Sequence, residues 1–184
     1  MVTSVVPHDP NWKRAFDEEA YALKAALNPL EITLHHIGST AIEGILAKPI
    51  IDLLGVVQNF ISLDAATQAM TELGYNVMGE YGIESRRYFR KINEQGLRTH
   101  HLHVYQQGSP HIVRHIAFRD YLCAHPDIAR DYSSLKAQLT EEPKKEAGAE
   151  GQSLAWENYL DGKDPFIQRV QGQAIAWAKR QKDQ

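Results

Sequence analysis

Apolar residues change their spacing several times along the first third of the chain. From Trp12 to Leu27 they recur every three or four positions, which predicts an amphipathic helix started by Asp9-Pro10. Residues 31–37 are β-branched and apolar, as in a strand, whereas residues 38–49 carry no regular pattern. Residues 50–57 are apolar nearly throughout, and this continuous run predicts a central strand covered on both faces.

The middle of the chain predicts one helix and three strands. A helix is expected from Ser62 to about Leu73, because Ser62 can cap its start and Gly74 can end it. Short strands are expected over residues 75–78 and 86–92, and a longer strand over residues 99–106.

The last part of the chain is predicted to be mainly helical. The charged segment 141–151, EEPKKEAGAEG, contains Pro and Gly and predicts a loop. Helices are expected over residues 111–123, after His125-Pro126 to about residue 139, and over residues 153–181 with a break near Asp161-Gly162. Together the elements predict an α+β fold in a single domain, 1–184, with a sheet-containing core over about 1–107 and a mainly helical part over about 109–184.

Composition and charge argue against several classes of protein. The net charge of −3 gives no general attraction to nucleic acid, so we do not expect a nucleic-acid partner. No apolar run approaches the ~20 residues that a membrane-spanning helix needs, and the start of the chain lacks the features of a signal peptide. The single cysteine, Cys123, excludes an internal disulfide. We therefore expect a cytoplasmic protein with no membrane partner, and the sequence leaves its oligomeric state open.

One charged residue interrupts the most apolar predicted strand. Asp52 lies within residues 50–54, where a buried carboxylate costs several kcal/mol unless it is paired or binds a cation. The preceding Gly38-Ser39-Thr40 can approach a ligand closely and hold phosphate oxygens with hydroxyl and backbone N–H groups. Lys48 could pair with Asp52 or point at a phosphate. These residues predict a cleft at the strand end, in which Asp52 binds a ligand or metal; the alternative is a purely structural carboxylate.

The spacing of the Gly-Ser turn and the aspartate resembles the signature of the nucleotidyltransferase fold. In that fold the turn holds the triphosphate and Asp-x-Asp on the next strand binds a divalent metal. The chain is also similar to the GrpB-like family, which is found fused to dephospho-CoA kinase in some bacteria. The resemblance implies a nucleotidyltransferase-like mixed sheet flanked by helices, with a C-terminal helical segment. It rests on four blocks in the same order: HHIGSTAIEGILAKPIIDLL, GIESRRYFRK, RTHHLHVYQQGSP and RHIAFRDYLCAHPDIARDYSSLK.

The chain departs from the pattern of an active transferase at the predicted metal site. Leu54 stands where the second carboxylate of Asp-x-Asp would fall, and a leucine cannot bind a metal. The strand that would supply a third carboxylate instead offers His101 and His103 on one face, followed by Tyr105 where a histidine-triad enzyme would have its third histidine. Asp52, His101 and His103 form a candidate site for a divalent metal, and imidazole favours Zn²⁺ or Mn²⁺ over Mg²⁺.

Further charged side chains are candidates for the same cleft. Glu43 and Glu84 could supply a missing carboxylate, although nothing in the sequence places either beside Asp52. His36, on the first strand, is a candidate neighbour of the histidine strand. A basic strand offers guanidinium groups that match phosphate well, unless it is simply a solvated edge. Its candidate phosphate-binding residues are Arg86, Arg87 and Arg90.

The leading hypothesis is a nucleotide or other phosphorylated small molecule bound between Gly38-Ser39 and Asp52. If the protein is an enzyme, the residues predict nucleotidyl or phosphoryl transfer, with Asp52, Ser39 and His103 as the catalytic groups. Two alternatives stay open. One is a non-catalytic binding module, which Leu54 favours, and the other is a metal-dependent hydrolase that uses the histidines.

Overall fold

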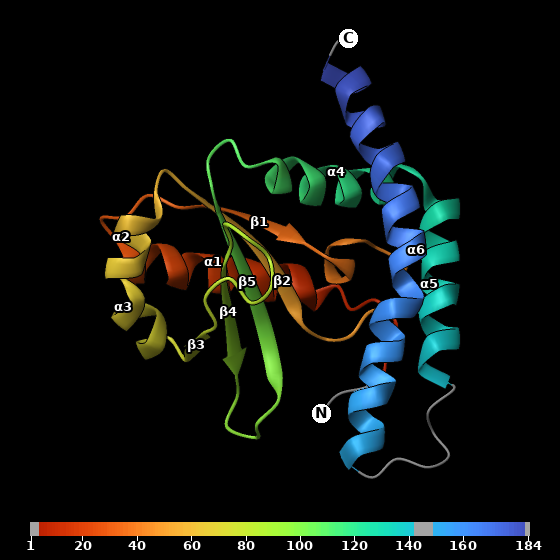
Figure 1. Ribbon diagram of the computed structural model, residues 1–184, viewed down its shortest axis with the longest axis horizontal. Helices are drawn as coiled ribbons and strands as arrows, with labels where there is room; N and C mark the ends of the chain where they lie inside the picture. The colour runs from red at the N-terminus through yellow and green to blue at the C-terminus, as the bar shows by residue number, and fades with distance from the viewer. Residues whose placement is uncertain (1–3, 142–148, 183–184) are drawn as a thin grey trace.

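A mixed five-stranded sheet with helices on both faces forms the framework of the molecule (Figure 1). The computed structural model describes residues 4–141 and 149–182. The strand order is β1-β2-β5-β4-β3, in which β2 and β5 are parallel and the other neighbours are antiparallel. The elements in chain order are α1 (Asn11–Leu27), β1 (Thr33–Ile37), the 3-10 helix η1 (Ser39–Ala41), β2 (Ile51–Val57), α2 (Phe60–Ala65), α3 (Thr67–Glu72), β3 (Tyr75–Val77), β4 (Arg87–Ile92), β5 (Arg98–Gln106), α4 (Pro110–Ala124), α5 (Pro126–Glu141) and α6 (Ala149–Lys182).

The inner strand β2 has one apolar face and one face with a carboxylate. Successive side chains of a strand point to opposite faces, so Ile51, Leu53 and Val57 share one side. These residues pack in the main core with the buried side chains of α1 and with Leu63 and Met70 of the short helices α2 and α3. Asp52 and Leu54 therefore lie on the opposite face of β2.

Helix α4 covers part of this second face. Leu54 packs in a small buried cluster with Ile37 and Tyr105, and Ile112 and Ile116 of α4 close the cluster. Leu54 is fully buried. The apolar contact explains why this position of β2 carries leucine, because a carboxylate here would lose its hydration without gaining a partner in the cluster.

Three C-terminal helices make a second core beside the sheet. Ala117 and Tyr121 of α4 pack against Val170 and Ala174 of α6, and α5 joins the same cluster through residues such as Ala129. In Figure 1, α6 runs alongside α5 and passes the end of α4. The helices therefore stand as a wall at one side of the sheet.

The predicted break near Asp161-Gly162 is wrong, because α6 continues through both residues and through Pro165. Gly162 has a different role. A Cβ at this position would lie 2.5 Å from Cδ2 of Leu139, so glycine permits the close approach of α6 to α5. The predicted loop 141–151 falls mainly on residues 142–148, which lie outside the described residues, and its last part is already helical because α6 begins at Ala149.

Most of the predicted elements are confirmed with small shifts of their ends. The first strand begins at Thr33 instead of residue 31. The single helix expected from Ser62 is two short helices, and the first begins at Phe60 because the Asn59 side chain accepts a hydrogen bond from the Ser62 N–H. The expected mixed sheet flanked by helices, with a C-terminal helical segment, is also confirmed. Among the residues that the structure describes, no helix is both long and apolar enough to cross a membrane.

Candidate functional site

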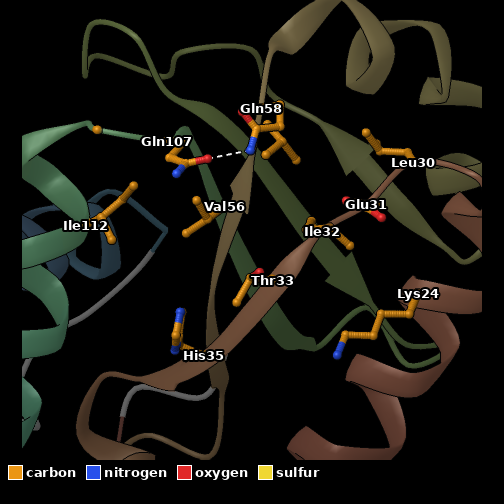
Figure 2. Close-up of a pocket in the computed structure, with 12 residues that line it drawn as sticks. Lys24, Leu30, Glu31, Ile32, Thr33, His35, Val56, Gln58, Gln107 and Ile112 are labelled. Atoms are coloured by element: carbon orange, nitrogen blue, oxygen red, sulfur yellow. Dashed lines mark hydrogen bonds between the residues drawn. The ribbon is translucent and has the colours of Figure 1, made fainter.

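The described residues line several cavities of similar size, and one of them, at the sheet edge, does not contain the predicted chemistry. It measures about 690 Å³ and follows the edge of β1 (Figure 2). Its ionisable lining residues are Lys24, Glu31 and His35, and a hydrogen bond from the Gln58 side chain to that of Gln107 crosses one end. These charges are spread along an open groove, so the groove does not match the predicted site.

Another cavity lies at the face of β2 that carries Asp52 and measures about 510 Å³. This volume is in the range of small-molecule sites. The cavity is bounded by the turn before η1, by β2 and β5, and by the helical wall. Its lining residues are Ile37, Gly38, Ser39, Thr40, Lys48, Ile50, Asp52, Ile83, His101, His103, Arg114, His115, Phe118, Tyr132, Tyr159, Lys163, Ile167 and Gln171.

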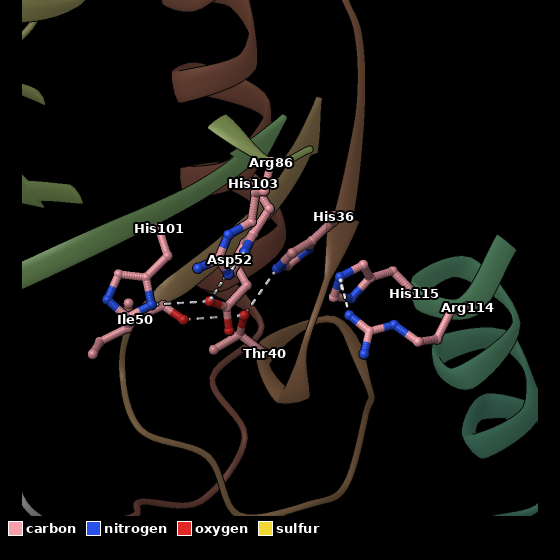
Figure 3. A network of polar contacts seen from close by, with 9 residues as sticks. All are labelled: His36, Thr40, Ile50, Asp52, Arg86, His101, His103, Arg114 and His115. Atoms are coloured by element: carbon pink, nitrogen blue, oxygen red, sulfur yellow. Dashed lines mark hydrogen bonds and ion pairs between the residues drawn. The ribbon is translucent and has the colours of Figure 1, made fainter. Parts of the chain in front are cut away.

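Asp52 lies between two imidazoles of the neighbouring strand (Figure 3). Its Oδ1 is 3.2 Å from Nδ1 of His101 and 3.9 Å from Nε2 of His103, and 28% of the side chain stays exposed. Burial on its own would raise the pKa of Asp52. The hydrogen bonds and charges of His101 and His103 outweigh burial and hold that pKa well below its usual range. Asp52 is therefore an anion at neutral pH.

Arg86 fixes the orientation of His103. Its side chain is 6% exposed and donates to the backbone carbonyls of Glu80 and Tyr81. Nη1 of Arg86 lies 3.3 Å from Nδ1 of His103. A guanidinium can only donate, so Nδ1 accepts and the imidazole proton sits on Nε2, which faces Asp52. Burial lowers the pKa of His103, although Asp52 opposes that shift.

The Gly-Ser turn packs directly against Asp52. Gly38 has φ +70°, and a Cβ there would lie 2.9 Å from Cβ of Asp52 and closer still to its carboxylate. Only glycine therefore allows this approach without strain. The next residue, Ser39, accepts a hydrogen bond of 3.0 Å from Nζ of Lys136, which also donates to the Leu46 carbonyl. Lys136 is 1% exposed, and burial lowers its pKa to about 7.

Two further lysines flank one aromatic ring of the cavity wall. Nζ of Lys48 and of Lys163 lie 3.8 Å and 4.2 Å from the ring centroid of Tyr159. Burial, with a smaller contribution from Lys163, lowers the pKa of Lys48 to about 8. Burial also lowers the pKa of Lys163 to about 8, although the charge of Asp52 opposes this shift. Both lysines are cations at neutral pH, although burial removes part of the water around their amines.

The helix α4 adds one more cation and a neutral histidine. Nη2 of Arg114 lies 3.2 Å from Nε2 of His115, and both side chains line the cavity. Burial lowers the pKa of His115 to about 3, with smaller contributions from neighbouring cations. His115 is therefore neutral at pH 7 and can accept the hydrogen bond from Arg114.

The structure brings together most of the predicted site residues, but Arg86, which lies behind His103, and three others do not line the cavity. His36 points to the other face of the sheet, where its ring stacks on Phe16 at 4.9 Å, and burial lowers its pKa to about 4. It still reaches Thr40 at the rim, with 3.0 Å between Nε2 and Oγ1. Arg87 pairs with Asp64 at 2.8 Å on that same face. Arg90 donates a hydrogen bond of 3.2 Å to the Met78 sulfur.

The predicted metal ligands lie near one another without forming a recognisable centre. Among the described residues, no group of three or more His, Cys, Asp or Glu side chains is arranged to hold a metal ion. Neither Glu43 nor Glu84 lines the cavity. The set of Asp52, His101 and His103 as metal ligands stays a prediction.

Sequence reasoning missed the contribution of the helices. The missed side chains are Arg114, His115, Phe118, Tyr132, Lys136, Tyr159, Lys163, Ile167 and Gln171. One signal could have found part of this set. Tyr159, Lys163, Ile167 and Gln171 recur at every fourth position, which places them on one face of a helix. Nothing local in the sequence links that face to Asp52.

Comparisons with known proteins agree with this fold. A family model described as GrpB protein matches residues 2–173. The UPF0157 protein YqkA of Bacillus subtilis is 42% identical over 175 residues, which are 95% of this chain and 48% of that protein, so the chain spans about half of that relative. A dephospho-CoA kinase of Mycobacterium tuberculosis is 25% identical over 197 residues, which are 95% of this chain and 46% of that protein.

Two kinds of solved structure resemble this fold, a GrpB protein and a poly(U) polymerase. The crystal structure of conserved protein GrpB from Enterococcus faecalis has a TM-score of 0.84 at 37% identity and covers 95% of this chain and 99% of that one. The Cid1 poly(U) polymerase, as an H336N mutant bound to MgATP, has a TM-score of 0.52 at 12% identity over 78% of this chain and 46% of that one. The second likeness shows a shared nucleotidyltransferase fold and nothing further.

Proposed function

This chain belongs to the GrpB family, and we propose from its cavity that it binds a phosphorylated small molecule, with a nucleotide as the leading candidate, beside Asp52. The observation that carries the proposal is the charge of the cavity wall. Among the described residues that line it, Lys48, Arg114 and Lys163 are cations at neutral pH and Asp52 is the acidic side chain. Cations held in a poorly hydrated cavity favour an anionic ligand, because the ligand supplies the charge that the wall lacks.

The Gly38-Ser39 turn favours a phosphate over a small anion that carries a single charge. The Ser39 hydroxyl accepts from Lys136, so its own proton can turn toward a phosphate oxygen or toward the neighbouring Tyr132. Gly38 brings the backbone close to Asp52, where N–H groups of a tight turn can meet phosphate oxygens. A polyphosphate offers several charged groups to the turn and to the two lysines beside Tyr159, whereas a small anion offers one.

The side chains do not fit a centre with two magnesium ions. Leu54 is buried under α4 where the second carboxylate would stand, and the Asp52 carboxylate already accepts a hydrogen bond from His101. Octahedral magnesium sites rely on carboxylate and phosphate oxygens. These contacts favour a binding module over a two-metal transferase. Nucleotidyl or phosphoryl transfer through Asp52, Ser39 and His103, and hydrolysis at a zinc ion held by the histidines, remain the competing proposals.

Thermal unfolding with a panel of phosphorylated compounds tests the proposal. The panel contains nucleoside triphosphates, tripolyphosphate and coenzyme A precursors, each with and without Mg²⁺, Mn²⁺ and Zn²⁺. A ligand at about 100 times its Kd adds about 2.7 kcal/mol of stability. For a chain of this size that corresponds to a rise in Tm of about 5–10 °C. We expect this rise without added metal.

Variants separate the competing proposals. Lys163→Met should abolish most of the rise, whereas Lys179→Met, an exposed lysine on the same helix, should keep it. A rise that requires Mg²⁺ or Mn²⁺ and is lost in Asp52→Ala would favour transfer, and zinc retained through purification would favour the hydrolase. If no compound on the panel stabilises the wild type, or if Lys163→Met responds like the wild type, the proposed ligand class is wrong.

A further inference from the structure

We propose that Gln171 is a specificity-determining residue, which reads a hydrogen-bonding ring of the ligand at the end of the cavity opposite Lys163. This inference rests on the proposed function, because it assumes that the anionic group of the ligand lies beside Lys163. It adds that the ligand is elongated: a phosphate at one end, an apolar or ring-shaped middle, and a group with hydrogen-bond donors and acceptors at the other end.

One face of α6 supplies the axis of the site. Tyr159, Lys163, Ile167 and Gln171 all line the cavity and follow one another at intervals of four residues. Residues four apart lie above one another on a helix, and each residue rises by about 1.5 Å. Gln171 is therefore displaced from Lys163 by about 12 Å along the helix axis. The Lys163 amine turns toward Tyr159, 4.2 Å from its ring centroid and so away from Gln171, which favours a ligand longer than a bare phosphate.

The wall between the two ends is apolar. Ile167 faces the cavity one turn after Lys163, and Phe118 of α4 lines it from the neighbouring helix. The ring of Phe118 lies 6.0 Å from that of Tyr132 at nearly a right angle. Aromatic and aliphatic side chains of this kind accommodate the faces of a planar ring. Ile167 and Phe118 offer little to a charged group, so the part of the ligand that lies between Lys163 and Gln171 should be uncharged, although Arg114, one turn before Phe118 on α4, is a further cation of the wall.

Gln171 combines a fixed backbone position with a side-chain amide that is available to a ligand. Within the part of the chain that the structure describes, its side-chain amide has no hydrogen-bond partner. Its neighbours along α6, Val170 and Ala174, are fully buried against Ala117 and Tyr121 of α4, so the backbone that carries Gln171 is fixed. An amide donates through nitrogen and accepts through oxygen, which lets it distinguish rings by their pattern of donors and acceptors.

The inference is tested by the nucleobase preference of Gln171→Leu. The dissociation constants of ATP, GTP, CTP, UTP and tripolyphosphate are measured by calorimetry for the wild type and the variant. Leucine has a similar volume without the amide, so the fold should hold, and Tm checks this directly. The matched control is Gln173→Leu, an exposed glutamine on the same helix that does not line the cavity.

We expect the wild type to bind at least one nucleotide more tightly than tripolyphosphate. Gln171→Leu should weaken the preferred nucleotide by about threefold to tenfold, reduce the differences among the four nucleotides, and leave tripolyphosphate binding unchanged. Gln173→Leu should match the wild type. The role of Gln171 is overturned if Gln171→Leu keeps the wild-type preference, or if tripolyphosphate binds as tightly as every nucleotide. Neither result would affect the anion site at Lys163, whereas a failure of all five compounds to bind would remove the proposed function itself.

Discussion

Replacing Lys163 by methionine should make the free protein more stable while removing its anion site. The side chain lies in the cavity wall of α6, 4.2 Å from the ring centroid of Tyr159. Burial lowers its pKa to about 8, even though the negative charge of Asp52 acts in the opposite direction. A cation that the fold desolvates in this way is retained at a cost in stability, which is expected of a residue that serves a ligand.

The size of the effect follows from the pKa. At pH 7 both the folded and the unfolded states carry the charged lysine, so the folded state bears the full effect of a pKa lowered from 10.5 to about 8. That difference corresponds to about 3 kcal/mol. The lost cation–π contact with Tyr159 offsets about 1 kcal/mol of the gain. We therefore expect Lys163→Met to be about 2 kcal/mol more stable than the wild type, a rise in Tm of about 4–8 °C.

Urea unfolding at a series of pH values measures this difference. Lys179→Met should stay within about 0.5 kcal/mol of the wild type, because its side chain is exposed. Between about pH 8 and pH 10.5 the folded wild type releases the Lys163 proton before the unfolded chain does, so the wild type gains stability and the gap to the variant shrinks. A variant less stable than the wild type at pH 7, or a gap that widens with pH, would refute the reasoning.

Three further predictions address the anion site, the turn and the core. Between pH 7 and pH 9 the affinity for tripolyphosphate should fall by about tenfold for each cavity lysine with a pKa of about 8, since only the protonated amine attracts the anion; calorimetry measures it, and a constant affinity would contradict it. Gly38→Ala should destabilise the protein by about 1–3 kcal/mol in thermal unfolding, because φ is +70° and the new Cβ meets Asp52; an unchanged Tm would show that the turn can relax. Lys91→Met should lower the free energy of unfolding in urea by about 3 kcal/mol, because it leaves the Glu19 carboxylate buried without this lysine. In the wild type that carboxylate lies 2.8 Å from Nζ of Lys91 and is 9% exposed. A loss below about 0.5 kcal/mol would contradict this prediction and would mean that water hydrates Glu19 in the variant.

The parts of the site that local sequence patterns encode could be predicted. Asp52 stood out because it is the one charge in an apolar strand, and Gly38-Ser39 because a turn of small residues precedes that strand. Period-2 alternation correctly grouped His101 with His103 on one face of β5, the face that meets Asp52. These inferences need only the geometry of single strands and one turn.

The helical half of the cavity could not be predicted in the same way. Lys136 meets Ser39, and Tyr159 meets Lys48, only because α5 and α6 pack beside the sheet, and no spacing rule relates such distant segments. The position of the Arg86 side chain depends on the loop before β4, because the guanidinium donates hydrogen bonds to the carbonyls of Glu80 and Tyr81. The sequence offered Arg86 as a phosphate ligand, whereas in the structure it supports His103.

A crystal structure of the chain with a saturating nucleoside triphosphate tests the central claim most directly. The account predicts that phosphate oxygens lie within hydrogen-bonding distance of Ser39 and of Nζ of Lys163, with the ring of the ligand extending along α6 toward Gln171. Phosphates bound in the groove at the edge of β1, or anywhere else outside the cavity beside Asp52, would contradict it.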